Sequence, residues 1–143
     1  EKNVAALITE YWQLIALFSE FETVGIHEYK FNIKNMNYKI LFFAASVQTS
    51  IEKWPVGIYA SFVRITEQMV FSGPNLGMPY TKAMGDGLFE IRARGAEGIG
   101  RAFFCCMKGR RVVILHGFVK KTQATPVKEL RLARQRMKEV LND

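Results

Sequence analysis

The stretch "GLFEIRARGAEGIGRAFFCCMKGRRVVILHGF" (residues 87–118) predicts three strands joined by two short turns. Residues 87–94 alternate between an apolar face and a charged face, formed by Phe89, Ile91 and Ala93 and by Glu90, Arg92 and Arg94. The glycine-rich "GAEGIG" (95–100) joins two strands and does not open a helix, which favours a hairpin over a phosphate-binding loop. With strands over 101–107 and 112–118, the stretch predicts an antiparallel meander.

Helices and one further strand are expected on both sides of this meander. Residues 37–45 are rich in β-formers and predict a first strand. Pro55 separates two helical segments, 46–54 and 56–71. Thr125 and Pro126 fit the N-cap and first turn of a last helix over 126–141. The order predicts a small α+β fold in which helices pack on an antiparallel sheet.

Residues 1–35 differ from the rest of the chain. They hold three basic and five acidic residues, and their apolar residues recur at helical spacing. We expect an amphipathic helical extension with a connector, ahead of a core domain over 36–143. Met36 could be a native start, so the extension need not belong to that domain. The apolar stripe should either pack on the core or mediate self-association.

The charge favours a polyanionic partner such as nucleic acid. The net charge is +7, and residues 92–138 contain thirteen Lys and Arg but only two acidic residues. A solvated basic face is the simpler alternative. No secretory signal is visible, and no apolar run approaches the ~18 residues of a membrane span, so a cytoplasmic protein is expected. Cys105 and Cys106 are adjacent, which suits neither a disulfide nor a metal site, and we expect no cofactor.

The predicted meander can gather groups that handle a phosphodiester. Arginine forks bind phosphate oxygens and stabilise a pentacoordinate transition state. Histidine titrates near neutrality, and a lysine among cations has a lowered pKa, so both types can transfer protons. The candidates for catalysis are Arg92, Arg94, Arg101, His116, Lys120 and Lys121, with Glu90 and Tyr80 as possible acid/base groups. Further RNA contacts are expected from Lys82, Arg110, Arg111, Arg131 and Arg134.

Each of these residues also has a structural interpretation. A single histidine at the end of a strand is often structural, and two lysines can belong to an ordinary solvated loop. Glu90 could act as a base, or it could simply neutralise Arg92. None of the candidates alone identifies an enzyme.

Two segments resemble the HigB-like, phage-derived branch of the RelE/ParE toxin superfamily. They are "LGMPYTKAMGDGLFEIRARGAEGIGRAFFC" (76–105) and "VVILHGFVKKTQATPVKELRLARQR" (112–136). The resemblance extends over 36–143 but not over 1–35. It implies a RelE-like fold and a toxin of a type II toxin–antitoxin system. Such toxins are ribosome-dependent endoribonucleases that cut translated mRNA and inhibit translation, and a helix-turn-helix antitoxin holds them inactive.

The resemblance assigns functional roles to Arg92, Arg94, Arg101, Lys120 and Lys121, and it includes His116 in the family motif. The sequence also departs from RelE proteins, which carry a lysine where Glu90 falls and a tyrosine after the final strand. Two other functions remain open on the same residues. One is a non-catalytic, ParE-like inhibitor of DNA gyrase, and the other is a basic nucleic-acid-binding or phage structural module.

Overall fold

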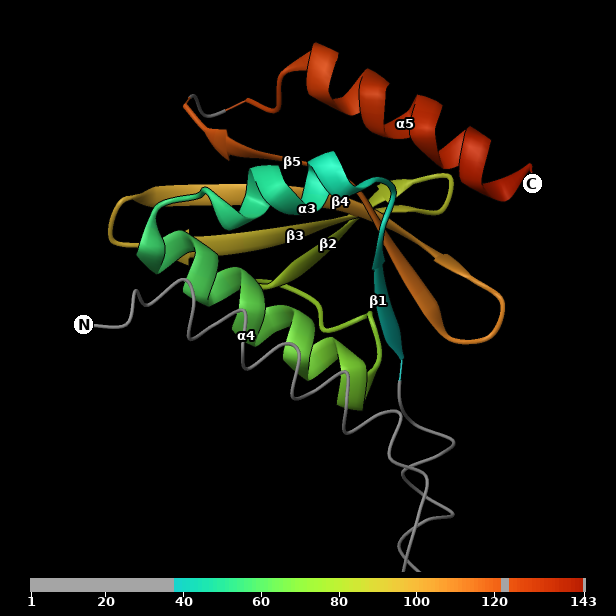
Figure 1. The fold of residues 1–143 in the computed structure, drawn as a ribbon, viewed down its shortest axis with the longest axis horizontal. Helices are drawn as coiled ribbons and strands as arrows, with labels where there is room; N and C mark the ends of the chain where they lie inside the picture. Colours follow the sequence, from blue (N-terminus) through green and yellow to red (C-terminus); the bar gives the residue numbers. More distant parts are fainter. Residues whose placement is uncertain (1–37, 122–123, 143) are drawn as a thin grey trace, which may run out of the picture.

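A computed structural model describes residues 38–121 and 124–142 of the chain (Figure 1). The expected extension over 1–35 lies outside the described residues. The elements in chain order are β1 (Lys39–Phe42), α3 (Ala45–Glu52), α4 (Val56–Ser72), β2 (Thr81–Gly85), β3 (Leu88–Gly95), β4 (Gly98–Met107), β5 (Arg111–Lys120) and α5 (Val127–Leu141).

The strands form one five-stranded sheet in the order β1-β5-β4-β3-β2. Strands β2 to β5 are antiparallel neighbours, and β1 pairs in parallel with β5 at the far edge. The predicted α+β class is confirmed. The sheet has one antiparallel strand more than predicted, because β2 extends the meander at its edge through pairs such as Thr81 with Ile91.

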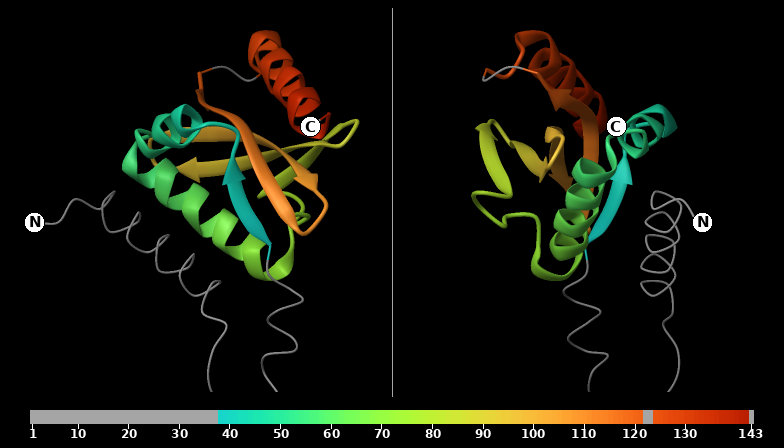
Figure 2. Two further views of the ribbon diagram at one scale, coloured as in Figure 1. Left: turned by 45° about the vertical axis from the view of Figure 1, so that its right-hand side comes forward. Right: turned by 90° about the vertical axis from the view of Figure 1, so that its left-hand side faces the viewer.

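Helices cover both faces of the sheet (Figure 2). Helices α3 and α4 pack on one face and form the larger core, which contains Ile58, Phe62, Phe104 and Ile114. Helix α5 packs on the opposite face over a smaller cluster that contains Leu88, Phe103, Leu115 and Met137. Alternate residues of the central strands therefore enter different cores, as the pleat of a strand requires.

The sheet packs closely against the larger core because glycines stand at the points of contact. A Cβ at Gly95 would lie 2.5 Å from the backbone nitrogen of Ile58, and a Cβ at Gly100 would lie 2.6 Å from the Trp54 ring. The Gly57 N–H donates to the Glu97 carboxylate at 2.9 Å, which ties the β3–β4 hairpin to the start of α4. The N–H groups of Gly57 and of Glu97 itself lower the pKa of this carboxyl.

A register shift in β5 decides which side chains reach the face under α5. Phe104 of β4 pairs with Ile114, but the next residue back, Phe103, pairs with His116, so Leu115 is an extra residue in β5. Strict alternation from Val112 and Ile114 would have pointed His116 toward α3 and α4. The bulge instead turns His116, and after it Phe118 and Lys120, to the face on which α5 packs.

The structure differs from the sequence-based predictions at two points. Strand β5 continues to Lys120, so His116 lies within the strand and does not end it. Thr125 is not the N-cap of the last helix, because Pro126 holds that position and no side chain caps the helix. The hairpin at 95–98 and the turn at 107–111 agree with the prediction. Within the described residues, no helix is long and apolar enough to cross a membrane.

Candidate nucleic-acid interface

Helix α5 covers only part of its face of the sheet. At one end, the side chains below the helix are apolar, including Leu88 of β3 and Phe103 of β4. Further along the same strands, this face becomes charged through Glu90 and Arg92 of β3, Arg101 of β4 and Lys120 of β5. We call Arg92, Arg101 and Lys120 the cation cluster.

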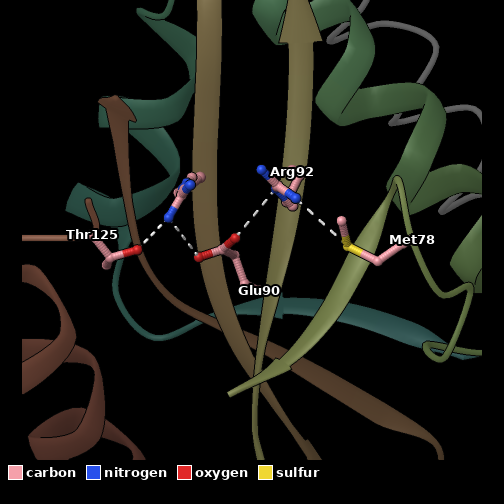
Figure 3. A network of polar contacts seen from close by, with 5 residues as sticks. Met78, Glu90, Arg92 and Thr125 are labelled. Carbon is pink, nitrogen blue, oxygen red and sulfur yellow. Dashed lines mark hydrogen bonds and ion pairs between the residues drawn. The ribbon is translucent and has the colours of Figure 1, made fainter. Parts of the chain in front are cut away.

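Glu90 lies between the two arginines of the cluster (Figure 3). Arg92 and Arg101 are directly opposed across β3 and β4, where like charges repel each other. One oxygen of Glu90 lies 3.6 Å from Arg92 Nε, and the other lies 3.4 Å from Arg101 Nη1. Only 1% of Glu90 is exposed, so its carboxylate is not open to a substrate hydroxyl. This geometry favours a role in holding the arginines over a role as a base.

Arg101 is buried but incompletely bonded. Its Nη1 donates both to Glu90 and to the Thr125 hydroxyl (Figure 3). The residue is 7% exposed, and its Nε is buried with no hydrogen-bond partner in the described part of the chain. A buried donor without a partner costs about 1–3 kcal/mol, so this atom calls for an explanation.

Arg92 and Lys120 are more accessible than Arg101. Arg92 Nη1 lies 3.6 Å from the sulfur of Met78, on the outer side of the pair with Glu90 (Figure 3). Lys120 lies diagonally across the β4–β5 pair from Arg101. Desolvation lowers the pKa of the Lys120 ammonium, the positive charges of Arg101 and Arg92 lower it further, and Glu90 opposes them. The lysine is therefore a better proton donor than an isolated one.

His116 is engaged with α5. Its Nε2 contacts the Glu129 carboxylate in the first turn of the helix. Its ring stacks on Phe118, with 6.1 Å between the ring centroids. The contact holds the start of α5 against β5, which is a structural role for the histidine.

The remaining candidates lie at different places. Arg94 and Lys121 are exposed near the cluster, at the end of β3 and just after β5, and Lys82 is exposed opposite Glu90. Tyr80 precedes β2, and its carbonyl accepts from the Arg92 N–H. Arg110 lies in the turn at the other end of β4 and Arg111 begins β5, on the order of 20 Å away along the strand. On α5, Arg131 is exposed, and Arg134 donates to the carbonyls of Met84 and Gly85.

Three residues of this interface were not predicted from the sequence. They are Thr125, Met78 and Glu129, the partners of Arg101, Arg92 and His116. A threonine just before a proline and a helix is typical of an N-cap, so no local pattern indicated that its hydroxyl would bond an arginine in β4. Met78 and Glu129 likewise meet their partners only through tertiary packing.

No metal site forms in the described ranges, where no three His, Cys, Asp or Glu residues are grouped. Both cysteines are free, and they take no part in the interface. Burial, together with the neighbouring Cys106, raises the pKa of the Cys105 thiol to about 11. Burial also raises the pKa of Cys106.

A comparison with protein families identifies the family of this chain. A model of the family described as "Phage derived protein Gp49-like (DUF891)" matches residues 49–138, which is more than half of the chain. The matched range includes α4, all four antiparallel strands and the complete cation cluster. No curated protein matches the chain. The chain belongs to the Gp49-like family of phage-derived proteins, a family associated with toxin–antitoxin systems.

Proposed function

We propose that the protein is the toxin of a type II toxin–antitoxin system, and that it acts as a ribosome-dependent mRNA endoribonuclease. Two independent findings support this proposal. The chain belongs to a family associated with such systems, and it carries a cation cluster on an open face of its sheet. The resemblance of residues 76–136 to HigB-like toxins connects the two findings.

The excess positive charge of the cation cluster, in which two arginines share the single carboxylate of Glu90, is the observation that carries the proposal. Glu90 balances only one of the two guanidinium charges, and Arg92 and Lys120, which are more accessible than Arg101, offer donors to phosphate oxygens. A phosphate here would pair with the remaining positive charge. Charge-assisted bonds of this kind are shorter and stronger than neutral ones, and they strengthen further as charge builds up in a pentacoordinate transition state.

The cut proceeds by attack of the 2′-oxygen on the adjacent phosphorus. The 2′-hydroxyl loses its proton, the P–O5′ bond breaks, and the departing 5′-oxygen takes up a proton, which leaves a 2′,3′-cyclic phosphate and a 5′-hydroxyl. Lys120, whose pKa is lowered by desolvation and by Arg101 and Arg92, donates the proton to the leaving oxygen. Glu90 is too enclosed to accept the first proton, and a group of the ribosome or the solvent takes that role.

Primer extension on translated mRNA tests the proposal. Expression of the full chain should arrest growth and produce new 5′ ends within coding regions. Arg92→Ala and Arg101→Lys should each reduce the cuts by about 10²-fold, because each removes donors aimed at the phosphate. Arg64→Ala, an exposed change on α4, is the control for Arg92→Ala with the same loss of charge. Intact mRNA with induced DNA damage would refute the proposal in favour of gyrase inhibition.

A neighbouring reading frame that encodes a small helix-turn-helix protein would provide the expected antitoxin. Co-expression of that protein should restore growth, and the two proteins should co-purify. Without such a partner, the toxin would have no means of being held inactive. Rescue by the neighbouring protein therefore tests the toxin–antitoxin part of the proposal separately from the chemistry of RNA cleavage.

A further inference from the structure

The turn before β2 is firmly held, yet it leaves two large apolar side chains in solvent. The Gly77 N–H donates to the Thr81 hydroxyl at 2.8 Å, and the Tyr80 N–H donates to the Gly77 carbonyl at 3.0 Å. Thr81 is 2% exposed, whereas Tyr80 and Met78 are 46% and 59% exposed. Two neighbouring large side chains held in solvent on an ordered turn form an apolar surface, and such surfaces can mark binding sites.

The register places Tyr80 beside the cation cluster. Thr81 pairs with Ile91, and the Arg92 N–H donates to the Tyr80 carbonyl at 2.8 Å, so Tyr80 lies opposite Arg92. Arg92 in turn pairs with Arg101, which pairs with Phe118. One row across four strands therefore reads tyrosine, arginine, arginine, phenylalanine. With strands ~4.8 Å apart, the tyrosine lies about two strand spacings from Arg101.

The two aromatic residues at the ends of this row have different surroundings. Phe118 stacks against Phe103 at 5.9 Å and against His116 at 6.1 Å, so it fills space beside α5. Tyr80 has no ring contact among residues 38–121 and 124–142, and its neighbours are Arg92 and the turn that carries Met78. Tyr80 is 46% exposed, whereas Phe118 is partly buried between its two ring contacts, so Tyr80 is the more accessible of the two.

We propose that Tyr80, with Met78 beside it, is a shelf on which one unpaired nucleobase stacks while Arg92 and Arg101 hold an adjacent phosphate. This rests on the proposed function, which supplies the RNA phosphate. A base in a duplex hides both of its faces, so the shelf selects single-stranded RNA. Stacking on an aromatic ring tolerates every base, which suits a site that must accept many mRNA sequences.

Binding of defined oligonucleotides by the full chain tests the shelf. The probes are a fluorescein-labelled RNA of ten nucleotides with mixed sequence, the same RNA with abasic residues at its centre, and a hairpin of equal charge. Tyr80→Leu should weaken binding of the first probe by about ten-fold or more. Tyr80→Phe keeps the ring and should bind as the wild type does. The wild type should bind the abasic probe and the hairpin as weakly as Tyr80→Leu binds the first probe.

Further variants separate this inference from the proposed function. Arg92→Ala should weaken binding of all three probes and reduce the salt dependence, whereas Tyr80→Leu should leave that dependence unchanged. If Arg92→Ala lowers affinity but Tyr80→Leu does not, the shelf is overturned and the phosphate site stands. If no probe binds and Arg92→Ala cleaves mRNA as the wild type does, the phosphate site and the shelf both fail, whereas a wild type that makes no cuts in translated mRNA overturns the proposed function itself. Loss of antitoxin binding alone in Tyr80→Leu would mark a protein contact and also overturn the shelf.

Folding does not confound these measurements. Tyr80 is half exposed, and both replacements keep an apolar side chain, so the thermal midpoints of the variants should match that of the wild type. Tyr80→Phe also tests the other role considered for this residue. A tyrosine that donates a proton would lose cleavage with its hydroxyl, whereas the shelf retains both affinity and cleavage.

Discussion

The two halves of the sheet surface that faces α5 are built on the same strands but have opposite character. In β3, buried Leu88 precedes Glu90 and Arg92; in β4, Arg101 precedes buried Phe103. The half under α5 is apolar, and its side chains pack against Ala133 and Met137. The open half is polar, and its buried groups bond one another. Stability and ligand chemistry are thus separated along the strands.

The reverse face of the sheet shows no such division. Ala93, Ala102 and Phe104 of β3 and β4 all lie in the core under α3 and α4. At Gly100, which is on the strand segment behind the open half, the Trp54 ring packs so closely that a Cβ would approach within 2.6 Å. The open half is therefore supported from behind by close packing in the larger core.

The largest effect should come from the half under α5. Phe103→Ala should lower the free energy of unfolding by about 3–5 kcal/mol, because it removes a fully buried ring and leaves a cavity. Arg92→Ala, two strand rows away in the open half, should cost about 1 kcal/mol, because Arg92 is partly exposed and Glu90 keeps Arg101 as a partner. Urea unfolding of both variants measures the difference. Equal losses would show that the two halves do not differ in this way.

A smaller loss should follow from separating the buried pair of the open half. Among the described residues, Arg101→Met leaves Glu90 with Arg92 as its remaining cationic partner, and should cost about 2 kcal/mol. Adding Glu90→Gln should recover much of this loss, because the amide carries no charge to compensate. Urea unfolding of the single and double variants measures the coupling free energy between Arg101 and Glu90. If the double variant loses as much unfolding free energy as the two single variants together, Arg101 and Glu90 do not stabilise each other as their geometry indicates.

Much of this fold could be predicted from local patterns. The alternation over residues 88–94 predicted which side chains of β3 share a face, and glycine-rich turns marked both ends of β4. Strand β2 escaped prediction because it is short, lies at an edge and contains neither valine nor isoleucine. The helix over 126–141 was expected from its spacing, although its start is one residue later and lacks the expected cap.

The candidate site was less predictable, for a physical reason. Residues 112–115 are all buried because both faces of β5 are covered, so their apolar run carries no alternation from which a face could be read. The bulge at Leu115 is therefore invisible in the sequence, yet it sets the direction of His116 and Lys120. The roles of Thr125 and Glu129 depend on where α5 docks, which no local pattern specifies.

The contact between His116 and Glu129 lies at the boundary between the two halves. Glu129→Gln should lower the free energy of unfolding by about 1 kcal/mol, because both side chains are partly exposed and the pair is worth less than a buried one. Glu139→Gln, an exposed change on the same helix, is the matched control. Hydrogen exchange in α5 should quicken in the first variant only. Unchanged exchange would mean that the apolar residues alone hold the helix.

The smallest effect concerns the charge of Lys120 in the open half. Desolvation, together with Arg101 and Arg92, lowers the pKa of this ammonium, so its positive charge is lost at a lower pH than that of an ordinary lysine. Affinity for single-stranded RNA should therefore fall by about two- to five-fold as pH rises through that lowered pKa. Lys120→Arg stays charged and should lose this step, whereas Lys39→Arg, on exposed β1, should retain it. Fluorescence titrations between pH 7 and about 10 measure the step. A step that persists in Lys120→Arg would assign the titration to another group and leave the proton donor of the proposed reaction without support.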